Sequence, residues 1–201
     1  MKNQYKAAIF DLDGTLLDTL EDLAAAANRM LDSYGYPVHP IDSYRHFVGE
    51  GAARLVHRVL PRKSISKAVE KECLASFLDD YRRHWRTRTC PYPGICDMLD
   101  ALTARGMRMA VLSNKPHEIT VQCVRHFLGK WSFQTVLGQR PQVPKKPDPA
   151  GALEIASLMN LSPSAFIYMG DTAIDMQTAR GAGMFAVGVL WGFRPAEELQ
   201  A

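Results

Sequence analysis

The chain has 201 residues, of which 47% are hydrophobic and 22% are charged, and its formal net charge is +3. This composition is typical of a folded globular protein and excludes disordered and fibrous chains, while the small positive charge does not by itself indicate a nucleic-acid partner. The four cysteines form no CxxC pair, and no apolar run approaches the about 18 residues that a membrane span needs. We therefore expect a cytoplasmic protein with reduced thiols.

Five short apolar runs predict buried strands, at residues 7–10, 107–112, 133–137, 166–169 and 185–190. Segments of helical character separate these runs, among them "ICDMLDALTAR" and "AGALEIASLM". This alternation predicts an α/β fold, a three-layer Rossmann-like parallel sheet with helices on both faces. In such sheets ligands bind beyond the C-terminal ends of the strands.

One region interrupts the alternation. Between residues 16 and 89 no strand-like run occurs, and the periodicity is helical in "LEDLAAAANRMLDSYG", "GAARLVHRVL" and "SKAVEKECLASFLDDYRRHW". The stretch "TCPYPG" at its end contains two prolines and a glycine and is suited to a hinge. We expect a core domain of residues 1–15 plus 90–201, with residues 16–89 inserted as an all-helical cap.

Two carboxylates follow the first predicted strand. Asp11 and Asp13 lie two residues apart in "AAIFDLDGTLLDT", and they point the same way if the backbone stays extended. Like charges this close repel each other unless a divalent cation lies between them, and oxygen ligands favour Mg²⁺. An aspartate beside such a cation can act as a nucleophile. The alternative is a polar turn in which Asp18 or Thr19 caps the next helix.

Polar residues also follow the second and third predicted strands. Ser113 and Asn114 offer a hydroxyl and an amide where phosphoryl oxygens would lie, although Ser-Asn is also common in ordinary turns. In "VPKKPDP", Lys146 precedes a proline and is the better candidate for neutralising a phosphoryl group, whereas Lys145 is expected to face water. A solvated charge pair is the alternative for this loop.

The fourth predicted strand runs into "GDTAIDM". Asp171 is a candidate metal ligand, and Asp175, four residues later, would face the same site from the first turn of a helix. Capping of that helix by Asp171 or Thr172 is the alternative. Phosphate or metal chemistry at all four strand ends is better explained by one active site than by four unrelated turns.

With these stretches in hand, the chain resembles the haloacid dehalogenase (HAD) superfamily, and within it the phosphoglycolate phosphatase-like hydrolases with a helical cap. "FDLDGTLLDT", "VLSNKP", "KKPDP" and "GDTAIDM" resemble the four motifs of that superfamily, in the expected order. The resemblance covers nearly the whole chain. Relatives of this kind usually continue through another strand and helix after the point corresponding to "VLWGFRPAEELQA".

The resemblance implies a role for each motif residue. Asp11 would be the nucleophile and Asp13 the general acid and base. Mg²⁺ would be held by the Asp11 carboxylate, the Asp13 main-chain carbonyl and Asp171, with Asp175 supporting through the waters of the metal.

Further residues would surround the phosphoryl group by the same resemblance. Ser113 and Lys146 would bind it, Asn114 would help to line the pocket, and Thr15 would orient the loop of the nucleophile. The implied activity is Mg²⁺-dependent hydrolysis of a small phosphate monoester through an aspartyl-phosphate. The acid at position 13 argues against dehalogenation, because that branch of the superfamily has no alkoxide to protonate.

The substrate would be selected by the cap. "FVGEGAARLVHR" resembles the cap loop of phosphoglycolate phosphatases, in which Gly49 and Gly51 permit close backbone approach and the following helix start offers amide donors to a carboxylate. Arg54 is a further candidate, although its place on an amphipathic helix equally suits a solvent-facing side chain. These features favour 2-phosphoglycolate.

Other functions remain open at this stage: a pyrophosphatase, a nucleotide or sugar-phosphate phosphatase, a β-phosphoglucomutase-like phosphotransferase, or a phosphate-binding regulatory protein without turnover. We expect a small phosphorylated metabolite as partner, a monomer or homodimer, and neither nucleic acid nor membrane binding. The basic, aromatic stretch "YRRHWRTR" is expected to form a packed helix face with a solvated charged edge.

Overall fold

The structure is a computed structural model that describes residues 5–61 and 65–200. The chain divides into two compact units, one formed by Met1–Asp18 with Pro91–Ala201 and the other by Thr19–Cys90. The first unit contains a parallel sheet and the second is helical.

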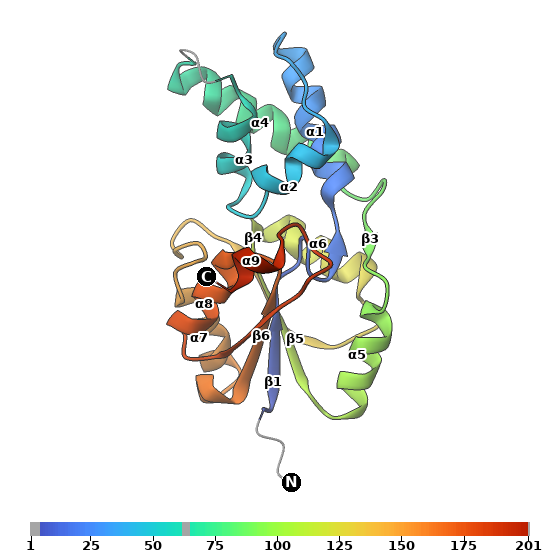
Figure 1. The fold of residues 1–201 in the computed structure, drawn as a ribbon, viewed down its shortest axis with the longest axis vertical. Helices are drawn as coiled ribbons and strands as arrows, with labels where there is room; N and C mark the ends of the chain where they lie inside the picture. The colour runs from blue at the N-terminus through green and yellow to red at the C-terminus, as the bar shows by residue number, and fades with distance from the viewer. Residues whose placement is uncertain (1–4, 62–64, 201) are drawn as a thin grey trace. The chain divides into compact units, whose positions relative to one another are not determined.

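Five strands form the parallel sheet of the first unit, in the order β5-β4-β1-β6-β7 (Figure 1). Their bounds are β1 (Ala7–Phe10), β4 (Arg108–Pro116), β5 (Phe133–Gln139), β6 (Phe166–Gly170) and β7 (Phe185–Gly188). β1 is central, and all four of its residues are buried, as expected for an apolar strand covered on both faces. The order reverses direction at β1, which is where ligands bind in sheets of this kind.

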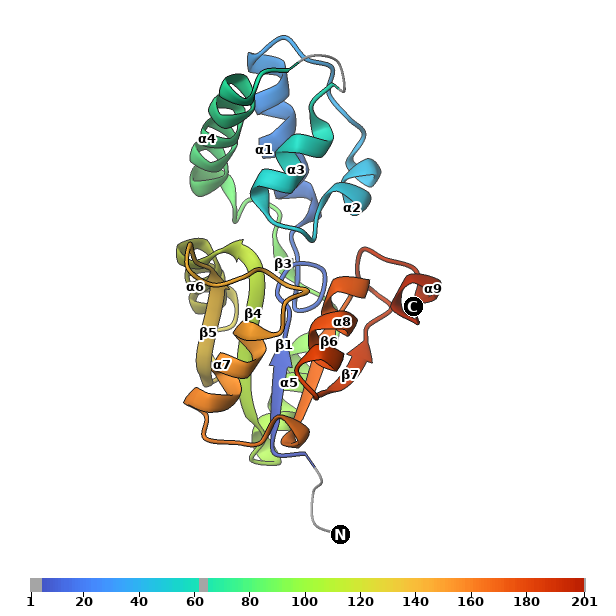
Figure 2. The ribbon, with the colours of Figure 1, turned by 90° about the vertical axis from the view of Figure 1, so that its left-hand side faces the viewer.

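Helices cover both faces of the sheet, with α5 and α6 on one face and α7 and α8 on the other (Figure 1), and the view turned by 90° agrees (Figure 2). The bounds of the helices in this unit are α5 (Ile95–Ala104), α6 (His117–Phe127), α7 (Ala150–Leu158), η2 (Pro163–Ala165), α8 (Ala173–Gly181) and α9 (Ala196–Leu199). The predicted α/β fold with a three-layer parallel sheet is therefore confirmed.

One side of the sheet packs a continuous apolar core. Ile9, Phe166 and Tyr168 from the strands meet Ile155 of α7 and Met184, which follows α8. All five side chains are buried. This packing holds the C-terminal ends of β1, β4 and β6 at one edge of the sheet, because the strands cannot slip without exposing apolar surface to water.

β4 is longer than the predicted strand, which ended at residue 112. It continues to Pro116 through polar residues, and its pairing with β5 shifts register between Leu112 and Pro116. Leu112 pairs with Leu137 and Pro116 with Gln139, so β4 carries two extra residues over this interval. A bulge of this kind redirects side chains at the end of a strand.

The second unit contains helices that pack around an apolar interior, with bounds α1 (Leu20–Ser33), η1 (Ile41–Ser43), α2 (Tyr44–Phe47), α3 (Ala52–Val59) and α4 (Lys67–His84). Met30, Val56 and Phe77, from α1, α3 and α4, are each at most 2% exposed. On the basic stretch Tyr81 and Trp85 are buried while its arginines are exposed, which confirms the predicted packed face with a charged edge.

Two sequence expectations fail near the start of this unit. Thr19 lies at the N-terminus of α1, yet its side chain makes no capping hydrogen bond within the described chain, because its backbone (φ −110°, ψ 3°) departs from the conformation of a capping residue. In addition, the region predicted to contain no strand includes β2 (Leu17–Asp18), which pairs with β3 (Cys90–Pro91). Two-residue strands are too short to leave an apolar run in the sequence.

Among the described helices, none is both long enough and apolar enough to cross a lipid bilayer.

Candidate active site

The strand register brings the motif residues to one edge of the sheet. Phe10 of β1 pairs with Val111 of β4 and with Met169 of β6. The next residue after Phe10 is Asp11, whose N–H donates to the Met169 carbonyl at 2.9 Å. Because all three strands are parallel, the side chains that follow them meet beyond the same edge.

Three carboxylates converge there. Oxygens of Asp11, Asp171 and Asp175 all lie within 4.8 Å of one another, and the three side chains are buried. The Nζ of Lys146 lies 2.9 Å from Asp11 Oδ1 and 2.6 Å from Asp175 Oδ1. The described residues thus place three acids around one lysine in this cluster. A donor set made only of carboxylate oxygens fits a hard divalent cation such as Mg²⁺.

The protonation equilibria reflect this crowding. Burial raises the pKa of Asp11 well above its usual value, the Lys146 ammonium opposes that rise, and the charges of Asp175 and Asp171 add to it. Burial is also the main cause that raises the pKa of Asp171 to about 7, with Asp175 as the second cause. Burial alone would lower the pKa of Lys146, but Asp11 and Asp175 together raise it well above its usual value. Ionising all three acids would give the cluster more negative charge than Lys146 offsets, and a cation would favour that ionised state.

Asp171 is fixed by groups from two distant segments. Its Oδ1 accepts from the Thr15 hydroxyl at 3.2 Å, and its Oδ2 accepts from the Phe193 N–H at 2.8 Å. A Cβ on Gly192 would overlap the Asp171 side chain and the Gly14 carbonyl. Thr15, expected to orient the loop of the nucleophile, thus bonds directly to the second acid of the cluster.

The segment from Trp191 to Phe193 was not identified from the sequence. The Trp191 indole donates to the Thr15 carbonyl at 3.0 Å, so this segment contacts both the first loop and Asp171. The signal that sequence reasoning could have used is the adjacent pair of an aromatic residue and a glycine just after the last predicted strand, since glycine permits close backbone approach.

Asp175 contributes both to the capping of α8 and to the cluster of three acids, whereas the sequence analysis considered capping by Asp171 or Thr172 as the alternative to a metal site. Thr172 precedes α8 and forms a capping box with it: the Thr172 N–H and hydroxyl donate to Asp175 Oδ2, at 3.2 and 2.7 Å. The other oxygen of the same carboxylate accepts from Lys146. Capping and site formation therefore coexist in Asp175, while Asp171 takes no part in the capping box.

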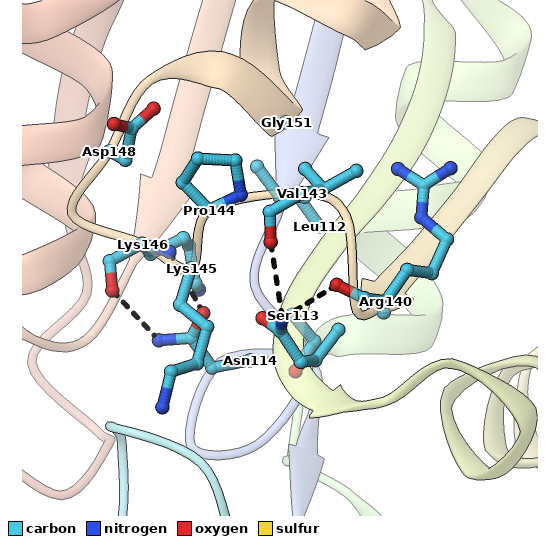
Figure 3. A pocket seen from close by; sticks show the side chains of 12 residues that line it. Leu112, Ser113, Asn114, Arg140, Val143, Pro144, Lys145, Lys146, Asp148 and Gly151 are labelled. Carbon is cyan, nitrogen blue, oxygen red and sulfur yellow. Dashed lines mark hydrogen bonds between the residues drawn. The ribbon is translucent and has the colours of Figure 1, made fainter.

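Asn114 holds the backbone of Lys146. Its Nδ2 donates to the Lys146 carbonyl at 3.1 Å and its Oδ1 accepts from the Lys146 N–H at 2.9 Å, as the dashed lines in Figure 3 show. Lys146 is buried and Lys145 is exposed, which is the predicted difference between the two lysines. The peptide bond between Lys146 and Pro147 is cis. Asn114 also lines the small pocket drawn in Figure 3, whereas its expected place beside a phosphoryl group stays a prediction.

Ser113 is buried beside Asn114, and both line the pocket drawn in Figure 3 together with the loop that carries Lys146. Gln139 closes that loop on itself, because its Nε2 donates to the carbonyls of Arg140 and Val143, at 2.8 and 3.1 Å. The predicted residues of the second and third motifs are thus neighbours.

Asp13 lies outside the cluster of three acids. Its Oδ1 accepts from the Nζ of Lys115 at 2.8 Å, and only 3% of the Lys115 side chain and 13% of the Asp13 side chain are exposed. Lys115 was present in the "VLSNKP" stretch but received no role from the sequence, because nothing in the spacing shows which way its side chain points.

The candidate cap residues belong to the helical unit. Gly49 and Gly51 have φ of 114° and 87°, a region that favours glycine, and Gly51 immediately precedes α3. The Arg54 side chain is half exposed, and its Nε lies 3.7 Å from Oε2 of Glu50. The backbone geometry expected of the two glycines is present, and binding of substrate by the three residues stays a prediction.

Comparison with known proteins identifies the family. The model of the haloacid dehalogenase-like hydrolases matches residues 8–189, which include all four motifs. The chain belongs to this family, and it is an enzyme of the phosphatase type within it.

Curated relatives are similar over almost the whole chain. A phosphoglycolate phosphatase from Pseudomonas putida is 34% identical over 98% of this chain and 73% of the relative. One from Psychrobacter arcticus is 32% identical over 96% of this chain and 86% of the relative. Among solved structures, a predicted phosphoglycolate phosphatase from Haemophilus somnus has a TM-score of 0.89 at 28% identity, covering 96% of this chain and 88% of that one.

Proposed function

We propose that the protein is a Mg²⁺-dependent phosphatase that hydrolyses 2-phosphoglycolate, or a closely similar small phosphate monoester, through an aspartyl-phosphate on Asp11. The observation that carries this proposal is the arrangement of Asp11 within 2.9 Å of Lys146 inside a cluster of three buried carboxylates. A carboxylate can approach a phosphate dianion only where positive charge offsets their repulsion. The relatives named phosphoglycolate phosphatase support the choice of substrate.

The acids have separate tasks in this proposal. Asp11, Asp171 and the main-chain carbonyl of Asp13 would hold Mg²⁺, and Asp175 would support its binding. When bound, the ion supplies positive charge beside the phosphoryl group and the nucleophile. Lys146 and the Ser113 hydroxyl bind the phosphoryl oxygens.

Catalysis then follows in two steps. An oxygen of Asp11 forms a bond to phosphorus while the bond from phosphorus to the alcohol oxygen breaks, and Asp13 gives its proton to the departing alkoxide. The same Asp13, now ionised, takes a proton from a water molecule, which attacks the aspartyl-phosphate. Inorganic phosphate leaves, and Asp11 and the protonated Asp13 are restored.

The activity is tested by phosphate release from a panel that contains 2-phosphoglycolate, pyrophosphate, nucleoside monophosphates and sugar phosphates, with Mg²⁺ and with chelator. We expect release from 2-phosphoglycolate with the highest kcat/KM, and its loss with chelator. Asp11→Asn should lower kcat by about three orders of magnitude or more, as expected when a covalent nucleophile is removed. Rapid acid quenching should trap phosphate on the wild-type chain and none on the variant.

Activity that survives in Asp11→Asn would exclude the covalent route. Transfer of phosphate to a sugar acceptor would instead identify a phosphotransferase. Binding of Mg²⁺ and phosphate without turnover of any panel member would identify a phosphate-binding protein.

A further inference from the structure

A second buried ion pair lies beside the cluster of three acids. Lys115 Nζ is 2.8 Å from Asp13 Oδ1, whereas Lys146 contacts Asp11 and Asp175. Each lysine therefore faces different carboxylates. Removing a lysine from water is unfavourable unless a well-placed partner offsets the lost hydration. Such a contact fixes the geometry of both side chains.

The backbone of Lys115 is anchored at both ends. Its N–H donates to the Ser113 hydroxyl at 3.2 Å, and its carbonyl accepts from the Thr120 hydroxyl at 3.2 Å. Gly138 of β5 lies directly behind it, since a Cβ on this glycine would come within 2.6 Å of the Lys115 carbonyl oxygen. The ammonium group thus projects from a rigid base toward Asp13.

The register shift of β4 explains why this residue reaches the first loop. Two extra residues lie between the pairs made by Leu112 and Pro116. Within this interval the Asn114 side chain bonds to the Lys146 backbone, while the next residue, Lys115, bonds to Asp13. Neighbouring residues of one bulge therefore support the two loops of the site separately.

Asp13 has no comparable support from its own loop among the described residues. Gly14 N–H donates to the Leu17 carbonyl and Thr15 N–H to the Leu12 carbonyl, so the backbone forms a tight turn. These backbone bonds do not fix the orientation of the Asp13 side chain. The contact that orients this carboxylate is the 2.8 Å hydrogen bond from the Nζ of Lys115 to Asp13 Oδ1.

We propose that Lys115 is a positioning residue for Asp13: it holds the carboxyl group in the orientation from which a proton passes to the leaving alkoxide. This proposal rests on the proposed function, in which Asp13 is the proton donor. Proton transfer requires hydrogen-bond reach in the reacting complex, so a side chain free to rotate donates less often. Lys115 itself touches no reacting atom in this scheme.

The test compares leaving groups. The value of kcat/KM reports the steps up to release of the alcohol. Lys115→Met should lower it by about tenfold or more for 2-phosphoglycolate and for propyl phosphate, whose alkoxides need a proton. For 4-nitrophenyl phosphate, which releases a stable anion, the loss should stay within about twofold. Lys115→Arg keeps the charge and should recover part of the loss.

Two further variants connect the effect to Asp13. Asp13→Asn should show the same selectivity against alkyl phosphates, and adding Lys115→Met to it should cause no further loss, because a residue that acts through Asp13 has nothing left to position. Lys130→Met is the matched control, since Lys130 forms an exposed 3.0 Å pair with Asp100 away from the four motifs. This variant should have the same kcat/KM as the wild type for all three substrates.

Equal losses on all three substrates would overturn the proposal in favour of a general structural role. A loss confined to 2-phosphoglycolate would overturn it in favour of a contact with the carboxylate of the substrate. If Asp13→Asn shows the selective loss and Lys115→Met does not, the positioning role fails while the proposed function stands. If Asp13→Asn itself shows no such selectivity, the proton step of the proposed function fails as well.

Discussion

Asp171 illustrates how single side chains set the chemistry of this site. It is buried, it is crowded by Asp175, and two donors from distant segments fix its two oxygens. Burial and the neighbouring acid raise its pKa to about 7, whereas the Phe193 N–H and Lys146 act in the opposite direction. At neutral pH the metal-free side chain is therefore divided between its two protonation states.

The first prediction concerns this titration. A metal needs the carboxylate form, so protons compete with Mg²⁺ as the pH falls through about 7. Apparent Mg²⁺ affinity should be nearly constant above pH 8 and should fall below pH 7 by up to about tenfold per unit for each proton displaced. Calorimetric titration of Mg²⁺ into the protein between pH 5.5 and 8.5 measures this dependence.

The raised pKa of Asp171 also affects the stability of the metal-free protein. The folded-state pKa of about 7 is above the ordinary value of 3.8, so between these values the folded state holds more protons than the unfolded state. This contribution to stability is present at low pH and is lost as the pH rises toward 7. A Mg²⁺ affinity that does not change across the whole range would contradict the assigned pKa.

Asp11 and Lys146 show what could be predicted at this scale. The sequence made both candidates for one site, because Asp11 follows a buried strand and Lys146 precedes a proline, and the structure brings Lys146 Nζ within 2.9 Å of Asp11 Oδ1. Their roles in the reaction stay predictions. Lys115 could not be assigned a partner, because its direction depends on a register shift of β4 that leaves no mark in the apolar pattern. Capping of α1 by Asp18 or Thr19 was the alternative to a metal site, and the Thr19 side chain makes no such hydrogen bond, because a preference for capping does not determine the local φ and ψ.

At the scale of elements, the segment that follows β7 is part of the site. Trp191 and Phe193 donate hydrogen bonds to the Thr15 carbonyl and to Asp171, and Gly192 lies between them against the Asp171 side chain. Strand periodicity predicted β7 itself but not the return of the chain toward β1. That return is a property of the folded sheet, in which β7 pairs beside β6.

The second prediction tests this segment. Gly192→Ala would place a methyl group where Asp171 and the Gly14 carbonyl lie, so Asp171 must move. We expect Mg²⁺ affinity to fall about tenfold or more, because loss of a positioning contact around a metal ligand costs about 10 to 100-fold. Titration calorimetry gives the affinity, and circular dichroism confirms that the fold persists.

Gly181→Ala is the matched control for that variant. A Cβ at Gly181 would meet Pro149 at 3.5 Å, an ordinary van der Waals contact. Its Mg²⁺ affinity should equal that of the wild type. Equal affinities in all three proteins would show that Asp171 is not positioned by Gly192.

At the scale of the whole molecule, all the core motif residues belong to the unit formed by the sheet, whereas Gly49, Gly51 and Arg54 belong to the helical unit. The alternation of apolar runs and helical segments was sufficient to predict the parallel sheet and its covering helices, because the strands are short and apolar. The helical periodicity was sufficient to predict the helices of the other unit, although the short strands β2 and β3 were missed. The choice of leaving group is the part of the function that no core motif specifies.

The third prediction follows from this division. A ligand that binds only the folded state stabilises it by about 2.7 kcal/mol at 100 times its dissociation constant. Mg²⁺ should therefore raise the unfolding temperature of the sheet unit, which holds all three acids, and leave that of the helical unit unchanged. Differential scanning calorimetry with and without Mg²⁺ measures both transitions.

Asp171→Asn is the control for that measurement, since it should abolish the Mg²⁺-dependent shift by removing a ligand. If the two units unfold in one transition, that transition should shift as a whole in the wild type and stay fixed in the variant. A shift that persists in Asp171→Asn would place the bound ion elsewhere.

The pairing of β2 with β3 determines how the chain passes between its units. Leu17–Asp18 and Cys90–Pro91 are neighbouring strands, so the chain departs and returns at adjacent points. An insertion whose two ends are already joined adds little strain to its host, whatever its length. An insert of another length, joined to the same two strands, should therefore leave the sheet and its cluster of three acids intact.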